Sequence, residues 1–104
     1  MKRVRLVLSD AAVADILEQA DWYVAQSGQA LAKRWEKAVA AAIRRVLNRP
    51  RSGTPCRFQS PELRGVRRTT ISGFPKHLLF YKVEKGEILI LRVVHGARDL
   101  EHLL

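Results

Sequence analysis

The chain contains 104 residues, of which 47% are hydrophobic, and 19 lysine and arginine residues against 10 aspartate and glutamate residues give a formal net charge of +9. This length and composition predict one folded domain over residues 1–104 and exclude an intrinsically disordered chain. The apolar runs are far shorter than the ~18 residues of a membrane span. The lone Cys56 excludes an internal disulfide and a multi-cysteine metal site. We therefore expect a small basic protein of the cytoplasm that does not associate with membranes.

The first elements are a strand and a helix. Residues 3–8 alternate polar and apolar side chains, which is typical of a half-buried strand. Ser9 and Asp10 are favourable N-cap residues and predict a helix over residues 10–27, which Gly28 ends in the left-handed conformation. Trp22 falls outside the apolar stripe of this helix, which consists of Val13, Ile16, Leu17, Ala20 and Val24.

A second amphipathic helix is predicted over residues 29–48 and ends before Pro50, because proline disfavours the helical conformation of the residue before it. Its apolar stripe comprises Leu31, Trp35, Ala38, Val39, Ala42, Ile43 and Val46. Only Ser27 and Gly28 separate the two helices, and so short a connection predicts an antiparallel helical hairpin.

Residues 51–62 are rich in proline, serine and glycine and predict a loop. Three strands are then expected, over residues 64–72, 77–83 and 87–95, with turns at residues 73–75 and 84–86. The order β-α-α-β-β-β predicts an α+β fold in which the helical hairpin packs on one face of a small, mainly antiparallel sheet.

The positive charge is concentrated in the middle of the chain. Residues 33–68 hold eleven basic and two acidic residues, whereas the rest of the chain is neutral and nothing between Leu6 and Ala32 is basic. This distribution favours a polyanionic partner, either a nucleic acid or an acidic protein segment. A solvated basic face without a partner is the alternative.

Sequence motifs for common catalytic sites are absent. The three histidines lack the spacing of a metal site, the glycines form no phosphate-binding loop, and no Gly-x-Ser-x-Gly motif occurs. The distinctive segment is VVHGARD, where His95 ends a strand and Gly96 permits a sharp turn before Arg98. These side chains and residues 64–68 (RGVRR) are expected to converge at one end of the sheet as an anion site. In the alternative, His95 donates to a backbone carbonyl and Arg98 pairs with a neighbouring carboxylate.

Several segments, in this order and at this spacing, resemble the RelE/ParE superfamily of type II toxin–antitoxin toxins, and most closely its ParE-like branch. They are residues 4–8 with Ala12 and Asp15, residues 22–24 (WYV), 49–53 (RPRSG), 63–67 (LRGVR), 77–81 (HLLFY) and 90–99 (ILRVVHGARD). The resemblance covers essentially the whole chain. It implies a toxin that forms a hetero-oligomer with an antitoxin, without a cofactor or metal.

The implied antitoxin neutralises the toxin by wrapping an acidic, partly disordered segment around it, and such a segment gains affinity from ordering on an arginine-rich surface. The side chains expected to contact it are Arg34, Arg44, Arg45 and Trp22.

The superfamily contains gyrase inhibitors and ribosome-dependent messenger RNA endonucleases. The nucleases use lysines and arginines on the second and third strands, an arginine after the last strand, and a late tyrosine. Here Arg98 matches the post-strand arginine, but Leu78 stands at the third-strand arginine, residues 69–71 (TTI) replace the lysines, and no tyrosine follows Tyr81. The resemblance therefore favours a ParE-like toxin that inhibits DNA gyrase by protein contact and is not an enzyme.

The side chains expected to contact the target are Arg64, Arg67, His95 and Arg98. If the chain is instead a metal-independent ribonuclease, His95 is the general acid or base and Arg98 binds the phosphate. A simple nucleic-acid-binding module is a third possibility.

Overall fold

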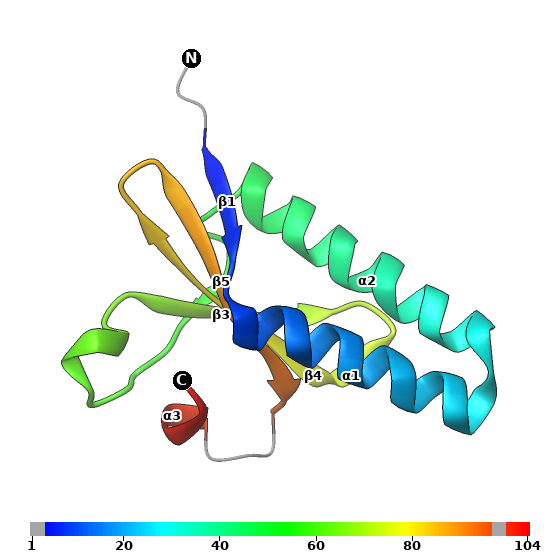
Figure 1. Cartoon of the computed structure of the whole chain (residues 1–104). Helices are drawn as coiled ribbons and strands as arrows, with labels where there is room; N and C mark the ends of the chain where they lie inside the picture. Colours follow the sequence, from blue (N-terminus) through cyan, green and yellow to red (C-terminus); the bar gives the residue numbers. More distant parts are fainter. Residues whose placement is uncertain (1–3, 97–99) are drawn as a thin grey trace.

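The computed structural model describes residues 4–96 and 100–104, which form a helical hairpin packed on one face of a five-stranded sheet (Figure 1). In chain order the elements are β1 (Arg5–Leu8), α1 (Asp10–Ser27), α2 (Gln29–Asn48), β2 (Thr54–Pro55), the 3₁₀ turn η1 (Pro61–Leu63), β3 (Val66–Ile71), β4 (Phe74–Glu84), β5 (Glu87–His95) and α3 (Leu100–Leu103). The strand order is β1-β5-β4-β3-β2, with β1 parallel to β5 and the other pairs antiparallel. The predicted α+β fold is confirmed.

Helix α1 begins where predicted, because the Ser9 side chain accepts a hydrogen bond of 3.0 Å from the Ala12 N–H. Its predicted apolar stripe is wrong in part. The helix buries Ala12, Ala20 and Tyr23, whereas Val13, Leu17 and Val24 remain 41–56% exposed. Small alanines let a helix approach its neighbours closely, so the buried face is the one that carries Ala12 and Ala20.

Strand β1 is shorter and more exposed than predicted. It begins at Arg5, and Val4 and Leu6 are 47% and 38% exposed. The strand lies at the edge of the sheet, where β5 pairs with one side of it and the helical hairpin covers little of its surface (Figure 1). An alternating pattern indicates a strand, but it does not tell how much of each face is covered.

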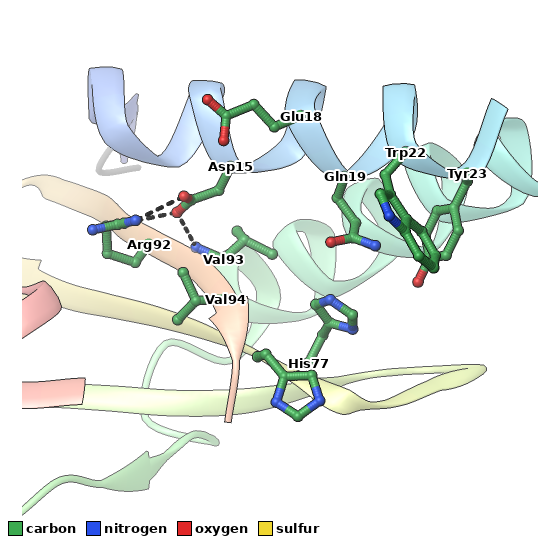
Figure 2. Close-up of a pocket in the computed structure, with 10 residues that line it drawn as sticks. Asp15, Glu18, Gln19, Trp22, Tyr23, His77, Arg92, Val93 and Val94 are labelled. Atoms are coloured by element: carbon green, nitrogen blue, oxygen red, sulfur yellow. Dashed lines mark hydrogen bonds and ion pairs between the residues drawn. The ribbon is translucent and has the colours of Figure 1, made fainter. Parts of the chain in front are cut away.

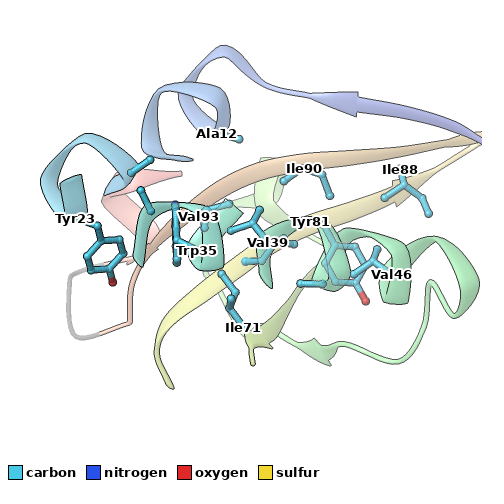
Figure 3. Packing of buried hydrophobic residues seen from close by; sticks show 14 residues of the cluster. Ala12, Tyr23, Trp35, Val39, Val46, Ile71, Tyr81, Ile88, Ile90 and Val93 are labelled. Atoms are coloured by element: carbon cyan, nitrogen blue, oxygen red, sulfur yellow. The ribbon is translucent and has the colours of Figure 1, made fainter. Parts of the chain in front are cut away.

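Helix α2 has the predicted bounds and the predicted inner face. Trp35 and Ala42 are completely buried, and they belong to a core that also contains Val39, Tyr81 and Ile90 (Figure 3). The Trp35 indole N–H donates a hydrogen bond of 3.1 Å to the Ile16 carbonyl, which ties α2 to α1. A buried indole requires such a partner, so Trp35 fixes the register of the helical hairpin.

Gly28 joins the two helices with a φ of +87° and a ψ of 178°. The positive φ explains why glycine stands here, but the extended ψ lies outside the left-handed helical region that was predicted. Helix α2 begins directly after it, at Gln29.

The three predicted strands form the expected meander, with shifted bounds. The turn after β3 occupies Ser72 and Gly73, so β4 begins at Phe74 and includes Pro75. A bulge beside Phe80 and Tyr81 shifts the register against β5. Both of these rings are fully buried, because Tyr81 faces the helices and Phe80 faces the opposite side of the sheet.

A second apolar cluster covers the face of the sheet away from α1 and α2. Its buried members are Leu63, Val66, Phe80 and Val94. Helix α3, which the sequence did not predict, folds over this face: Leu103 packs on the cluster, and the Glu101 carboxylate accepts hydrogen bonds from the backbone N–H groups of Gln59 and Ser60. The loop before β3 also contains β2 and η1, which were not predicted. In the described part of the chain, no helix combines the length and hydrophobicity needed to cross a bilayer.

Candidate functional site

An open cleft of about 550 Å³ lies between α1 and the carboxyl end of β5 (Figure 2). Strand β1 covers the edge of β5 only as far as the pair Leu8–Ile90, and α1 takes over from there. The helix lines the cleft with Asp15, Glu18, Gln19, Trp22 and Tyr23. The strands contribute His77 from β4 and Arg92 and His95 from β5. The cleft thus combines charged, aromatic and imidazole groups at one end of the sheet.

Arg92 and Asp15 form a bidentate ion pair at the base of the cleft. Arg92 Nε lies 2.7 Å from Asp15 Oδ2, and Nη2 lies 2.8 Å from Oδ1. Asp15 Oδ2 also accepts the Val93 N–H at 3.0 Å, and Arg92 Nη1 donates to the Leu103 carbonyl at 2.7 Å. Hydrogen bonding to the carboxylate raises the pKa of Arg92 further above its usual range. The pair therefore joins α1, β5 and the C-terminal segment, and its charges neutralise each other.

His77 and His95 are paired across β4 and β5, with their ring centroids 5.7 Å apart. The Trp35 ring packs edge-on against the His77 ring, with the ring centroids 4.9 Å apart. Burial lowers the pKa of His77, and the neighbouring His95 lowers it further. His77 is therefore neutral near pH 7 and can donate one hydrogen bond and accept another.

Gly96 follows His95 where the chain leaves β5. Its N–H donates a hydrogen bond of 2.8 Å to the Lys76 carbonyl, and an added Cβ would lie 2.9 Å from Leu78 Cδ1. A larger residue at this position would therefore require the Leu78 side chain to shift. The backbone hydrogen bond ties the end of β5 to β4.

Comparison with known proteins identifies the family. The sequence profile of the family described as "ParE toxin of type II toxin-antitoxin system, parDE" matches residues 6–100. The chain belongs to this ParE toxin family. The resemblance found in the sequence is thereby confirmed.

Two solved structures share the ParE fold. The chromosomal ParDE toxin–antitoxin system from P. aeruginosa is 22% identical with a TM-score of 0.74, over 91% of this chain and 98% of that chain. The YoeB/ParE toxin from Agrobacterium tumefaciens is 15% identical with a TM-score of 0.57, over 89% of this chain and 99% of that chain. At these identities the likeness concerns the fold alone. No curated protein matches the sequence.

Of the residues expected to contact the target, Arg64 and Arg67 lie far from His95. Arg67 is paired with Tyr81 on β4, four residues and therefore about 13 Å along the strand from His77. Its guanidinium donates to the Gly53 carbonyl at 2.8 Å and to the Arg51 carbonyl at 3.2 Å, so it holds the loop after α2. Arg64 is exposed before β3, beyond Arg67. The predicted convergence with His95 is therefore wrong for both arginines, and Arg98 lies outside the described residues.

The four side chains expected to bind the antitoxin differ in their surroundings. Arg34 is exposed beside a hollow of about 360 Å³ whose apolar wall includes Leu31 and Phe74. Arg45 donates hydrogen bonds to the Thr70 carbonyl at 2.7 Å and to Thr69 Oγ1 at 3.3 Å, so it already holds α2 on β3. Arg44 is exposed, and Trp22 is 56% exposed at the rim of the cleft.

Cys56 lies in the loop after β2 and is partly buried. Burial raises the pKa of its thiol, although Arg68 acts in the opposite direction. A protonated thiol is a poor nucleophile and a poor metal ligand. In residues 4–96 and 100–104, no group of three or more histidine, cysteine, aspartate or glutamate side chains is placed to hold a metal ion.

The sequence did not predict the role of Arg92. The sequence does contain an indication of this role, because Arg92 is the single charged residue in the otherwise apolar segment ILILRVV of β5. A buried or half-buried cation in such a strand requires a carboxylate partner. Asp15 is 77 residues away in the sequence, so the pairing itself could be found only from the structure.

Proposed function

We propose that this ParE-family chain is a toxin that inhibits DNA gyrase by protein contact and is neutralised by a cognate antitoxin. The observation that carries the choice of gyrase is the position of Leu78. By the resemblance, the ribonucleases of the superfamily carry an arginine there. Leu78 instead packs on the apolar cluster around Phe80 and Val94.

The surroundings of Leu78 also support a toxin that is not a nuclease. Metal-independent RNA cleavage requires cations that stabilise the charge developing on the phosphate. Thr69 and Thr70 occupy the region of the expected lysines, and both are engaged by Arg45. Leu103 and Leu104 pack on the same cluster as Leu78. Leu78 therefore stands among apolar side chains, and the cation beside it is Arg68, which lines the same hollow.

One observation favours the ribonuclease as a second candidate. His77 and His95 lie side by side in the cleft, and two adjacent imidazoles are suited to general acid and base catalysis. This pair lies on the helix side of the sheet, away from Leu78. A nuclease centred on it would differ from the arrangement implied by the resemblance.

The test uses the purified toxin with and without its antitoxin. We expect the toxin to inhibit DNA supercoiling by gyrase and to leave messenger RNA on ribosomes intact, and we expect the antitoxin to restore supercoiling. The double variant His77→Gln/His95→Gln separates the two candidates, because it would abolish RNA cleavage by an imidazole pair. Cleavage of ribosome-bound messenger RNA together with unaffected gyrase would overturn the proposal.

A further inference from the structure

The cleft beside Trp22 is acidic, although the chain as a whole carries a net charge of +9. Helix α1 contains four carboxylates, Asp10, Asp15, Glu18 and Asp21, and no basic residue. Asp15 is neutralised by its bidentate pair with Arg92. Glu18 is exposed, and its charge acts together with that of Asp15 to raise the pKa of Arg92. The carboxylates of Asp15 and Glu18 against the guanidinium of Arg92 leave one net negative charge among these three side chains of the cleft.

The same wall of the cleft is aromatic one turn further along α1. Trp22 is 56% exposed, and its ring packs edge-on against Tyr23 with the centroids 5.6 Å apart. Tyr23 is itself buried against Trp35 and Phe74, so this row of rings supports Trp22 from behind. Figure 2 shows Gln19, Trp22 and Tyr23 pointing from α1 toward His77. An exposed indole on a rigid support presents its face to a ligand without the loss of much side-chain entropy.

The polar groups available to a ligand in the cleft include strong acceptors. Glu18 offers two carboxylate oxygens, Gln19 offers an amide oxygen, and the indole face of Trp22 attracts cations through its quadrupole. His77 is neutral and adds no competing charge. A guanidinium matches this set because it is planar, stacks on indole and donates in a fork to a carboxylate.

We propose that the cleft receives an arginine side chain of the antitoxin, stacked on Trp22 and hydrogen-bonded to Glu18. This inference rests on the proposed function for the identity of the partner, but its chemistry is set by the cleft itself. The contact is additional to any acidic segment that binds the basic surface of α2. It would orient the antitoxin, since one partner must then place negative charge on α2 and positive charge on α1.

The position of the cleft favours a protein segment as the source of the arginine. Strand β1 ends at Leu8, opposite Ile90, so in the described part of the chain no strand covers β5 beyond that residue. Ser9 Oγ and Asp15 Oδ2 bond the backbone there, at Leu91 and Val93, and leave the cleft itself open. A protein segment that crosses the open cleft can insert a side chain into it. Nucleic acid is disfavoured there, because a phosphate would approach the exposed carboxylate of Glu18.

The test measures binding of N-acetyl-arginine amide to the isolated full-length toxin by NMR. The chain is strongly cationic, so it repels this probe everywhere except at an acidic site. We expect saturable shifts of the Trp22 indole N–H and of the Gln19 backbone N–H. The Trp35 indole N–H, which is buried and bonded to Ile16, serves as an internal control and should not shift. The neutral probe N-acetyl-glutamine amide should bind at least about fivefold more weakly.

Two variants complete the test. Glu18→Gln should weaken binding of the arginine probe by about threefold to fivefold, and Trp22→Leu should weaken it similarly. Asp21→Asn removes a charge from the same helix outside the cleft and should leave binding unchanged. Three results would overturn the proposal. They are chemical shift changes that do not saturate, equal binding of the arginine probe to Glu18→Gln and to the unchanged protein, and equal binding of the two probes to the unchanged protein. Because the measurement involves neither gyrase nor ribosomes, its failure would leave the proposed function standing.

Discussion

Arg92 binds Asp15 through two hydrogen bonds of 2.7 and 2.8 Å, although 77 residues separate them in the sequence. Both side chains are largely buried, with 21% and 10% of their surface exposed. Asp15 also accepts the backbone N–H of Val93, and Arg92 also reaches the Leu103 carbonyl. Helix α1, strand β5 and the C-terminal segment are thus joined by one ion pair. Its loss should affect the whole fold.

The Asp15→Asn variant should lower the free energy of unfolding by about 2 kcal/mol, because it leaves the Arg92 guanidinium without a countercharge in a partly buried position. The measurement is chemical denaturation followed by circular dichroism. The matched control is Glu87→Gln, which breaks the 4.0 Å pair between Arg5 and Glu87 at the edge of the sheet. The Arg5 side chain is 79% exposed, so the control should change stability by less than about 0.5 kcal/mol. Equal effects of the two variants would contradict this account.

Stability should decrease at acidic pH because of His77. Its folded-state pKa is lowered from the ordinary value of 6.5 by burial and by His95, so the unfolded chain binds protons more readily. The free energy of unfolding should therefore fall as the pH drops below about 6.5 and level off below the folded-state pKa. Denaturation at a series of pH values from 7.5 downward tests this, with His77→Gln as the variant. An unchanged pH dependence in His77→Gln would show that other groups are responsible.

The hydroxyl of Tyr81 holds the loop after α2 together with Arg67. Tyr81 donates to the Pro50 carbonyl at 2.8 Å and accepts the Gly53 N–H at 2.9 Å. Tyr81→Phe removes both bonds and should lower the free energy of unfolding by about 1 to 2 kcal/mol. Gly53→Ala should destabilise the fold by a further mechanism, since an added Cβ would overlap the Tyr81 ring. Thermal denaturation measures both, and the exposed Ser52→Ala is the neutral control; a full effect at Ser52 would argue against this explanation.

The arginines of α2 should separate into two classes. Arg34 and Arg44 are exposed and form no ion pair within the described residues, whereas Arg45 is bonded to β3. Replacing Arg34 and Arg44 with glutamine should slow association with an acidic antitoxin by about tenfold at low salt and leave stability unchanged. Arg45→Gln should instead lower the unfolding free energy by about 1 kcal/mol. Surface plasmon resonance at two salt concentrations measures the association rate, and chemical denaturation measures the stability. If replacing both Arg34 and Arg44 left the association rate unchanged, these arginines would not be part of the antitoxin-binding surface.

The regular elements could be predicted from the sequence because their signals are local. Ser9 and Asp10 mark the start of α1, Pro50 marks the end of α2, and the apolar stripe of α2 matches the buried face. The stripe of α1 was misassigned because this helix carries apolar residues on two sides. Which side is buried depends on where small residues permit close packing, and Ala12 and Ala20 decide it.

The candidate site could be predicted only in part. The sequence indicated His95 and the end of β5, and the cleft is indeed there. The expected contribution of Arg64 and Arg67 failed because nearness in the sequence to a strand does not fix which end of the sheet a residue occupies; the β3–β4 register does. The sequence did not single out Glu18, because a carboxylate on an amphipathic helix is usually solvated, and only the structure places it in the cleft beside Trp22.

The parallel pairing of β1 with β5 has a consequence for synthesis of the chain. Arg5 pairs with Glu87, so β1 cannot find its partner in the sheet until β5 has been synthesised. On the ribosome, the helical hairpin emerges before any sheet exists to cover its apolar face, and long-range pairing of this kind is slow to form. The nascent polypeptide therefore completes this sheet only after β5 has left the ribosome. A partner synthesised beforehand would meet each toxin molecule at the moment it leaves the exit tunnel.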